Sequence, residues 1–234
     1  MRSPRPIALV TGAGVRVGNA IARHLAKRGY VVVGHYRSHV PRGVAASLQA
    51  DLALADGPAT LAAAFRRRFE RLDLLVNSAA GFEERRIEEI DAASFDEQMD
   101  LNARAPLLLT RALLPLLRRS GGSVVNVIDV GGGLVPWRRY AAYAASKAAL
   151  ARITECLALE LAPKVRVNAV LPGAALFPKD WPAAKIRDHV RKIPLLRAGT
   201  PADVASAVAF LAEAPFVTGA LLPVDGGRHL SGRQ

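Results

Sequence analysis

The sequence predicts an α/β fold in which helices cover both faces of one doubly wound parallel sheet of about seven strands. Short β-branched runs alternate along the chain with longer helical patterns. Most of these runs are apolar throughout, as strands are when both faces of a parallel sheet are covered. The 234 residues, 51% of them hydrophobic, show no repeat, low-complexity tract or linker, so we expect one domain over residues 1–234.

The order of the elements follows the same rhythm. A first strand over 7–11 runs into a glycine-rich turn, and a helical pattern over 17–28 follows it. Further strands are expected over 30–35, 47–50, 72–77, 123–128, 165–170 and 220–224, and helices over 57–71, 94–117, 140–161 and 201–213. Such alternation requires right-handed crossovers. Residues 174–199 break the rhythm, are rich in Pro and Ala, and carry Trp181, so we expect a lid over a ligand site.

The charge of the chain raises nucleic acid as a partner, because the net charge is +12 and the pI about 10.8. The arginines fall in scattered doublets and triplets, such as 66–68 and 118–119, and only 6% of the residues are aromatic, too few for a base-stacking surface. We expect a solvated Arg-rich surface, with attraction of anionic small molecules as the second interpretation and no nucleic-acid partner.

Three features of the sequence bear on the cellular compartment of the protein, and they agree with one another. No apolar run reaches the ~18 residues that a membrane span needs, and residues 1–6 lack the apolar segment of a signal peptide. The single cysteine, Cys156, excludes an internal disulfide. We expect a cytoplasmic protein with no membrane partner and no metal site.

The turn after the first strand has the composition of a phosphate-binding loop. It reads Thr-Gly-Ala-Gly-Val-Arg-Val-Gly over 11–18, and a helix follows. Glycines such as Gly12 and Gly18 let the backbone approach a pyrophosphate, while the amides of Arg16 and Val17 open the helix and add positive potential. The position between first strand and first helix favours a dinucleotide cofactor and a Rossmann-type fold.

The second strand indicates which dinucleotide binds. It ends at Tyr36, Arg37 and Ser38, with no acid in reach to hold the ribose hydroxyls of NAD. Arg37, together with Arg16, suits a ribose 2′-phosphate through charge-assisted hydrogen bonds, so NADPH is favoured over NADH. Later strand ends add further expected contacts to the adenine and the second ribose, from Asp51, Leu52, Asn77 and Ala79.

Tyr143 and Lys147 are four residues apart in a helical pattern, so both side chains lie on one face. A neighbouring positive charge favours the tyrosine anion and lowers the pKa of a phenol, which ordinarily is about 10. A phenol adjusted in this way exchanges protons near neutral pH. The alternative is a surface pair on an Ala-rich helix.

These segments together resemble the short-chain dehydrogenase/reductase family over essentially the whole chain. The matching pieces are residues 11–18, Asp51-Leu52, residues 77–80, Asn102, Tyr143 with Lys147, and Pro172-Gly173. The resemblance implies that Tyr143 donates the proton, that Lys147 binds the nicotinamide ribose and lowers the pKa of Tyr143, and that Asn102 carries a water relay. It also implies cofactor contacts at Pro172 and Gly173, and a homotetramer built on the helices of Asn102 and Tyr143.

Three departures from the common pattern narrow the resemblance. The family usually has Gly at Arg16, a Ser at Asp129 and no particular aromatic residue at Phe82. Together they are the pattern of the pteridine reductase branch, including bacterial dihydromonapterin and dihydrofolate reductase-like members. The resemblance implies a pterin or folate-like substrate held by Arg16, Phe82, Asp129, Tyr143 and Trp181, with the ring between Phe82 and the nicotinamide. The spacing before Tyr143 implies a lengthened loop at 131–133.

The chemistry of Asp129 agrees with a pterin or folate-like substrate. A serine hydroxyl donates to a ketone oxygen, whereas an ionised carboxylate only accepts and repels developing alkoxide charge. Asp129 therefore suits a substrate with N–H donors or an imine nitrogen that gains a proton, and dihydropterins have both. The alternative is a carbonyl or 3-oxoacyl reductase in which Asp129 has a structural role. A non-catalytic NADPH sensor is a third interpretation.

Overall fold

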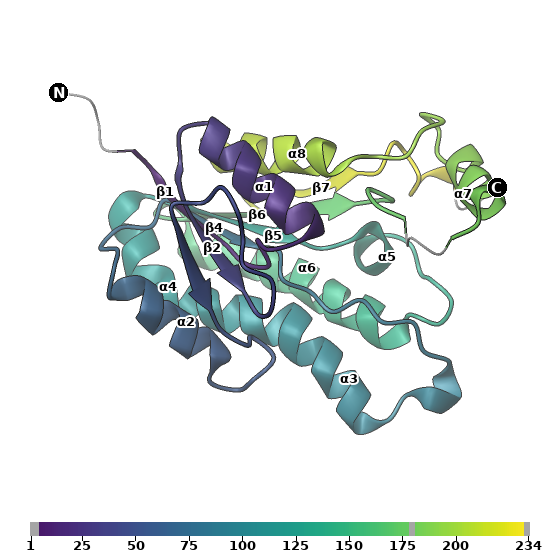
Figure 1. The fold of residues 1–234 in the computed structure, drawn as a ribbon, viewed down its shortest axis with the longest axis horizontal. Helices are drawn as coiled ribbons and strands as arrows, with labels where there is room; N and C mark the ends of the chain where they lie inside the picture. The colour runs from purple at the N-terminus through teal and green to yellow at the C-terminus, as the bar shows by residue number, and fades with distance from the viewer. Residues whose placement is uncertain (1–4, 178–180, 232–234) are drawn as a thin grey trace.

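The computed structural model describes residues 5–177 and 181–231, and within them seven parallel strands form one sheet (Figure 1). The strand order is β3-β2-β1-β4-β5-β6-β7. The bounds are β1 Ile7–Val10, β2 Val31–Tyr36, β3 Ala46–Gln49, β4 Leu74–Asn77, β5 Ser123–Val127, β6 Arg166–Pro172 and β7 Leu221–Val224. The predicted doubly wound α/β fold is confirmed. The expected domain also includes residues 1–4, 178–180 and 232–234, which lie outside the described residues.

Helices cover both faces of this sheet. α1 (Arg16–Lys27) and α8 (Pro201–Glu213) lie side by side on one face, and α2 (Gly57–Arg66), α4 (Ala105–Ser120) and α6 (Ala141–Leu161) lie on the other, with α3 (Ala92–Met99) beside α6 (Figure 1). Successive residues of β1 reach opposite faces, since Leu9 packs toward α2 and α4 while Ala8 and Val10 pack toward α1 and α8. This two-sided burial explains why the strand runs are apolar throughout.

The sheet topology fixes where a ligand can bind. From β1 the chain winds outward to β2 and β3, then returns to β4 on the other side of β1. At such a reversal the loops after the two central strands diverge and leave a crevice at the carboxyl ends of the strands. The glycine-rich turn follows β1, and Asn77 ends β4, so both predicted cofactor segments stand at this crevice.

Three predicted elements differ from the structure. The expected helix over 94–117 is instead α3, a π-helical turn Asp100–Arg104 and α4, because Asn102 turns inward to bond other segments. The expected loop at 131–133 is part of a short helix α5 (Val130–Gly133), which Asp129 caps by accepting from the Gly131 N–H. Residues 174–199 contain a helix of their own, α7 (Ala183–Arg191). Among the described residues no helix is long and apolar enough to cross a membrane.

Candidate active site

The glycine-rich turn is held against the end of β4. Gly12 has a φ of +67°, and a Cβ there would lie 2.9 Å from the Ala79 Cα. A Cβ on Gly18 would lie 2.2 Å from the Gly12 carbonyl oxygen. The Thr11 hydroxyl oxygen accepts hydrogen bonds from the backbone N–H groups of Ser78 and Ala79, both at 2.9 Å. A side chain at Gly12 or Gly18 would collide with neighbouring backbone, so glycine is required at both positions. The turn therefore exposes its backbone, without side chains, at the crevice.

The first turn of α1 offers free amide donors. Its N-cap residue, Val15, makes no side-chain cap, and no acidic residue occupies the turn. Uncapped N–H groups and the helix dipole favour an anion at this end. Arg16 begins the helix with a φ of +49°, a conformation that is uncommon for a residue with a side chain. The predicted phosphate-binding loop therefore has the geometry that phosphate binding needs.

A cavity of about 810 Å³ lies between this turn, α1 and the loop after β2. Its walls are formed by Gly14, Asn19, Arg23, Ser38, His39, Val40, Arg42 and Gly43. Two guanidinium groups and an imidazole make it suitable for a phosphate. The predicted cofactor-binding residue Ser38 lines the cavity, whereas Arg16 and Arg37, which were predicted for the 2′-phosphate, do not. Arg23 and Arg42 were not predicted; the spacing of Arg23 four residues after Asn19 on α1 was the available signal.

His35 connects the ends of three strands and was also missed. It is 2% exposed; its Nδ1 accepts from the Gly12 N–H at 3.2 Å, and its Nε2 donates to the Ala50 carbonyl at 3.1 Å. Burial lowers the pKa of His35, which keeps the ring neutral in this arrangement. A histidine inside an apolar strand was the signal. Beside it, Asp51 accepts from the Ala53 N–H, and Leu52 is buried.

The Asn77 side chain is buried and bonded within the protein. Its amide donates to the Asn126 side chain at 2.8 Å, and Asn126 donates to the Thr154 hydroxyl at 2.8 Å. The chain of bonds ties β4 to β5 and α6. The side chain of Asn77 is thus part of a buried polar network, and the backbone that follows it lies beside the glycine-rich turn.

Tyr143 and Lys147 lie at the centre of the site, on the face of α6 that packs toward the sheet. Both side chains are buried, and the Lys147 Nζ lies 5.9 Å from the centre of the Tyr143 ring. Lys147 donates to the Val127 carbonyl at the end of β5, at 3.0 Å. A Cβ on Gly132 would lie 2.2 Å from the Lys147 Cβ, so α5 closes over the lysine stem. The surface-pair alternative is therefore wrong.

The third ionisable group of the site is Asp129, at the start of α5. Its Oδ1 accepts from the Gly131 N–H at 2.7 Å, and its carboxylate lies close enough to Tyr143 and Lys147 for the charges of the three groups to interact. Burial raises the pKa of Asp129 to about 6, although the Gly131 N–H and the Lys147 charge oppose the rise. Burial also lowers the pKa of Lys147 to about 8, against the charge of Asp129. Asp129, Tyr143 and Lys147 therefore form one coupled group.

The pKa of Tyr143 differs from the expectation. Burial and the negative charge of Asp129 raise the pKa of the phenol well above its ordinary value. A lowering by Lys147 was expected, but the carboxylate is the neighbour that dominates. In this arrangement the Tyr143 phenol is protonated at neutral pH.

Asn102 occupies the π-helical turn and is fully buried. Its Oδ1 accepts from the Gly81 N–H at 2.9 Å, and its amide nitrogen donates to the Gly81 carbonyl at 3.1 Å and the Ser146 hydroxyl at 3.0 Å. Asn102 thereby fixes the segment after β4 against α6. The extra residue of a π-turn aims this side chain inward, a feature common at functional sites.

Three aromatic rings gather around the Tyr143 ring. The Phe82 ring is 52% exposed, stacks on the Tyr140 ring at 4.8 Å, and meets the Tyr143 ring edge-on at 4.9 Å. Trp137 meets Phe82 and Tyr140 edge-on, at 6.3 and 5.8 Å. A Cβ on Gly131 would lie 2.5 Å from the Trp137 ring, so the indole covers the start of α5. Tyr140 and Trp137 were not predicted; the position of Tyr140 three residues before Tyr143 was a usable signal.

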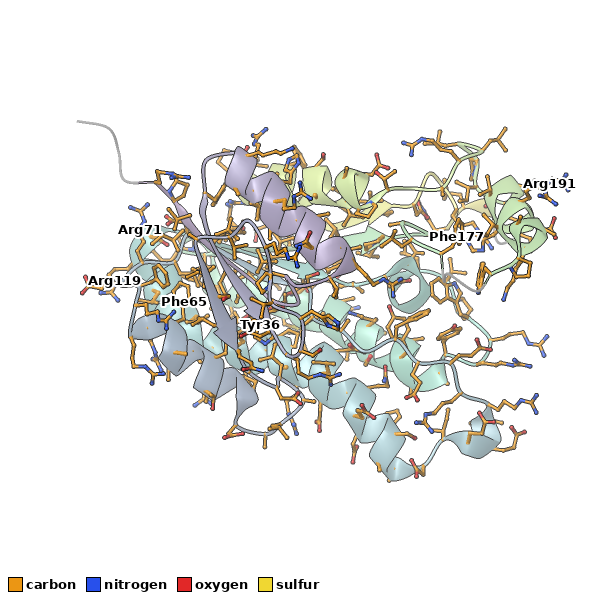
Figure 2. The ribbon with its side chains drawn as sticks, in the orientation of Figure 1. Tyr36, Phe65, Arg71, Arg119, Phe177 and Arg191 are labelled. Atoms are coloured by element: carbon orange, nitrogen blue, oxygen red, sulfur yellow. The ribbon has the colours of Figure 1, made fainter. Side chains whose placement is uncertain are left out.

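Trp181 belongs to a second aromatic group at α7. Its ring stacks on Phe177 at 5.6 Å and lies 5.9 Å from His189, while the Lys185 Nζ sits 4.0 Å from the centre of the Trp181 ring. Figure 2 shows Phe177 beside α7, at the same end of the molecule as α5. The contacts recorded for Trp181 in the described part of the chain are with this group and not with Phe82 or Tyr143.

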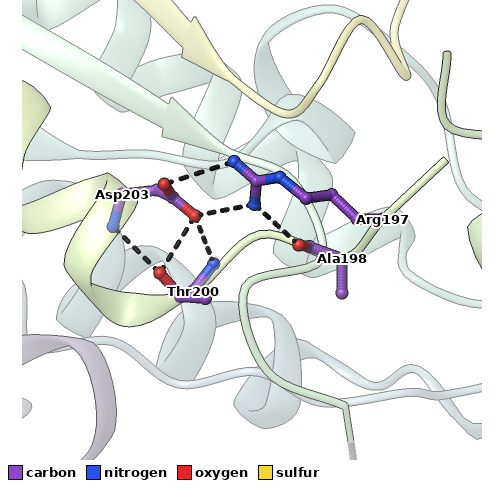
Figure 3. A network of polar contacts seen from close by, with 4 residues as sticks. All are labelled: Arg197, Ala198, Thr200 and Asp203. Carbon is purple, nitrogen blue, oxygen red and sulfur yellow. Dashed lines mark hydrogen bonds and ion pairs between the residues drawn. The ribbon is translucent and has the colours of Figure 1, made fainter. Parts of the chain in front are cut away.

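The segment 174–199 is fastened at both ends, and its residues 178–180 lie outside the described residues. Gly173 lies so close to the end of β7 that a Cβ there would come within 2.7 Å of the Cβ of Asp225, the residue after the strand. At the far end, Thr200 caps α8 with Asp203, and the Arg197 guanidinium bonds both Asp203 and the Ala198 carbonyl (Figure 3). These bonds lower the pKa of Asp203. The predicted Pro172-Gly173 pair thus stands where β6 opens into this segment.

Comparison with known proteins defines the class. A family model described as enoyl-(acyl carrier protein) reductase matches residues 12–229, and the chain belongs to the short-chain dehydrogenase/reductase family. Members of this family are oxidoreductases that use nicotinamide cofactors, which supports an oxidoreductase. The resemblance to the short-chain dehydrogenase/reductase family is thereby confirmed.

Individual relatives divide between two substrate classes. A Streptomyces violaceoruber protein assigned as a ketoacyl reductase of the granaticin polyketide synthase is 38% identical, over 96% of each chain. A dihydromonapterin reductase of Klebsiella pneumoniae is 32% identical, over 98% of each chain. The dihydromonapterin reductase of Escherichia coli O6:K15:H31 is 33% identical, over 97% of this chain and 98% of its own length.

Proposed function

We propose that this protein is an NADPH-dependent reductase of pterins, which converts a dihydropterin or dihydrofolate to the tetrahydro form. The observation that carries the proposal is the half-buried Asp129 carboxyl group, whose charge acts on the buried Tyr143 phenol beside it. Reduction of a ketone calls for donors around the oxygen that becomes negative. A carboxylate at this place suits an N–H donor and a ring nitrogen that is protonated.

Each group has a defined role in this proposal. When bound, the nicotinamide supplies the hydride. Tyr143 holds the proton at its phenol oxygen and delivers it to the ring nitrogen next to the reduced carbon. Asp129 accepts from the N–H groups of the substrate and keeps the phenol protonated. Lys147, charged below a pH of about 8, supplies positive potential beneath the phenol. Asn102 holds the Gly81 backbone and carries a water relay.

The cofactor and substrate contacts follow the crevice. We propose that Gly12, Arg16, Val17 and Gly18 hold the pyrophosphate, and that Arg23, Arg37, Ser38 and Arg42 hold the 2′-phosphate. The cationic walls of the cavity beside Gly14 support NADPH over NADH. Phe82 supplies an exposed ring for the pterin, and the segment that carries Trp181 covers it.

The runner-up is an NADPH-dependent ketoacyl reductase, which the 38% identical relative favours. Initial rates of NADPH oxidation with dihydrobiopterin, dihydrofolate and an acetoacetyl thioester separate the two. The proposal expects turnover of the pterins and at most a trace with the thioester. An Asp129→Ser variant should lose pterin turnover by ~10-fold or more, the value of a charge-assisted hydrogen bond, and gain on the thioester. Turnover of the thioester alone by the wild type would refute the pterin assignment.

We also propose that the enzyme is a cytoplasmic homotetramer. On α6, Leu159 is 84% exposed and borders a surface hollow with Ala158 and Gly219. A large exposed apolar side chain of this kind is suited to burial between subunits. Light scattering of the wild type and of Leu159→Lys tests this: a tetramer that the substitution leaves intact would exclude Leu159 from the interface.

A further inference from the structure

The orientation of the Phe82 ring is set by contacts with neighbouring rings. One face stacks on Tyr140, with ring centres 4.8 Å apart and planes 23° apart. The edge contact with Tyr143, at 4.9 Å and 89°, leaves Phe82 perpendicular to the phenol. Phe82 is in a loop after β4 and is 52% exposed, so the stacked contact with Tyr140 is what fixes its plane.

Tyr140 is in turn fastened by Glu84. The Tyr140 hydroxyl donates to the Glu84 Oε2 at 3.3 Å, and the Arg139 guanidinium donates to the Glu84 Oε1 at 3.1 Å. Between the same two loops the Arg85 N–H donates to the Arg139 carbonyl at 2.8 Å. Arg139 has a φ of +67°, so the turn before α6 is held in an uncommon conformation that aims Tyr140 at Phe82.

Two loops that are far apart in the sequence are thereby locked across the site. The loop after β4 contributes Phe82 and Glu84, and the loop after α5 contributes Arg139 and Tyr140. Neither loop has regular structure around these residues, so the stack and the carboxylate set their relative position. The result is a flat, exposed phenyl face held at a right angle to the ring of the proton donor.

We propose that Tyr140 and Glu84 are positioning residues: Glu84 holds Tyr140 against Phe82, and the pair fixes the plane in which a flat heteroaromatic substrate ring lies beside Tyr143. This inference rests on the proposed function and names the residues that give it ring selectivity. A small aliphatic ketone makes no use of a fixed ring plane, so the device acts on heteroaromatic substrates.

The test measures KM and kcat for dihydrobiopterin in Tyr140→Phe, Glu84→Gln and Tyr140→Ala. Tyr140→Phe keeps the ring and loses only the bond to Glu84, so it should raise KM ~3-fold. Glu84→Gln also removes the charge that pairs with Arg139, so it should raise KM at least as much. The double variant Tyr140→Phe/Glu84→Gln should be no worse than Glu84→Gln alone, because that substitution already removes the Tyr140 bond. Tyr140→Ala also loses the stack and should raise KM ~10-fold or more. Glu83→Gln, which removes the neighbouring partner of Arg85, is the matched control and should leave KM unchanged.

A binding measurement separates positioning from general damage. Trp181→Phe leaves Trp137 as the only tryptophan of the two in the chain, beside the Phe82 stack. Quenching of Trp137 fluorescence by dihydrobiopterin should then weaken in the Tyr140→Ala background, while the KM for NADPH and the melting temperature of Tyr140→Phe stay as in the wild type.

The outcomes distinguish the two proposals. Wild-type turnover of dihydrobiopterin with an unchanged KM in Tyr140→Ala, or additive losses in the double variant, overturns the positioning inference alone. Wild-type turnover of an acetoacetyl thioester without turnover or binding of dihydrobiopterin overturns the pterin assignment, and the positioning inference with it.

Discussion

Replacement of Asp129 by Asn tests the electrostatic account of the site. The side chain is half-buried near Tyr143 and Lys147, and its pKa is raised from 3.8 to about 6. A carboxyl group whose pKa is higher in the folded than in the unfolded state binds its proton more tightly when folded. Its contribution to stability is complete below a pH of about 4 and is lost as the pH rises through about 6. Asn does not titrate and removes this dependence.

The size of the effect follows from the pKa values. A difference of about two pKa units corresponds to at most about 3 kcal/mol in the free energy of unfolding. For a chain of this length that is ~6–12 °C in melting temperature. Between pH ~4 and ~7 the wild type should therefore lose up to ~3 kcal/mol more than Asp129→Asn.

Urea unfolding of both proteins at several pH values measures this difference directly. Asp56→Asn, which replaces an exposed aspartate, is the matched control and should keep the wild-type dependence. The same assay series should show that kcat/KM for dihydrobiopterin falls below a pH of about 6 in the wild type, as Asp129 is protonated. If the unfolding free energies of the wild type and Asp129→Asn run parallel from pH ~4 to ~7, burial does not raise the pKa of Asp129 and the reasoning fails.

Three further predictions use other parts of the structure. Thr11→Val leaves two backbone N–H donors without their acceptor, so we expect ~2–4 kcal/mol of destabilisation; calorimetry should show a melting temperature ~5–15 °C lower, and an unchanged value would contradict it. Arg23→Ala combined with Arg42→Ala should raise the KM for NADPH ~10-fold and leave that for NADH unchanged; equal losses for both cofactors would exclude a 2′-phosphate at this cavity. Ultraviolet titration should show that Asp129→Ala lowers the pKa of Tyr143; an unmoved phenol titration would show that the carboxylate does not control it.

The sequence was sufficient for the fold because the signals were local and repeated. Apolar strand runs and glycine spacing are read from neighbouring residues, and the seven-stranded parallel sheet followed from them. The break at Asn102 could not be read in this way. Its cause is a set of bonds to Gly81 and Ser146, which lie in segments distant along the chain. The helical periodicity of the sequence continues through Asn102 and gives no sign of this break.

The part of the site that was predicted correctly also depended on local signals in the sequence. Tyr143 and Lys147 are one turn apart on a helix, so sequence spacing placed them together correctly. The predicted direction of the pKa change at Tyr143 was wrong because burial of the phenol and the charge of Asp129 raise that pKa, and neither is read from helix spacing. Tyr140 and Trp137 reach Phe82 only through the path of two irregular loops. Loop paths are set by tertiary contacts and leave no periodic signal.

The raised pKa of Tyr143 bears on the proposed proton transfer. The Asp129 carboxylate makes loss of the phenol proton more costly, whether the proton goes to solvent or to a ring nitrogen of the proposed substrate. The proposed transfer leaves a tyrosinate next to Asp129, and the Lys147 charge is the neighbour that stabilises it. Lys147 therefore acts on the product of proton transfer and Asp129 on its reactant, and both set how readily Tyr143 gives up its proton.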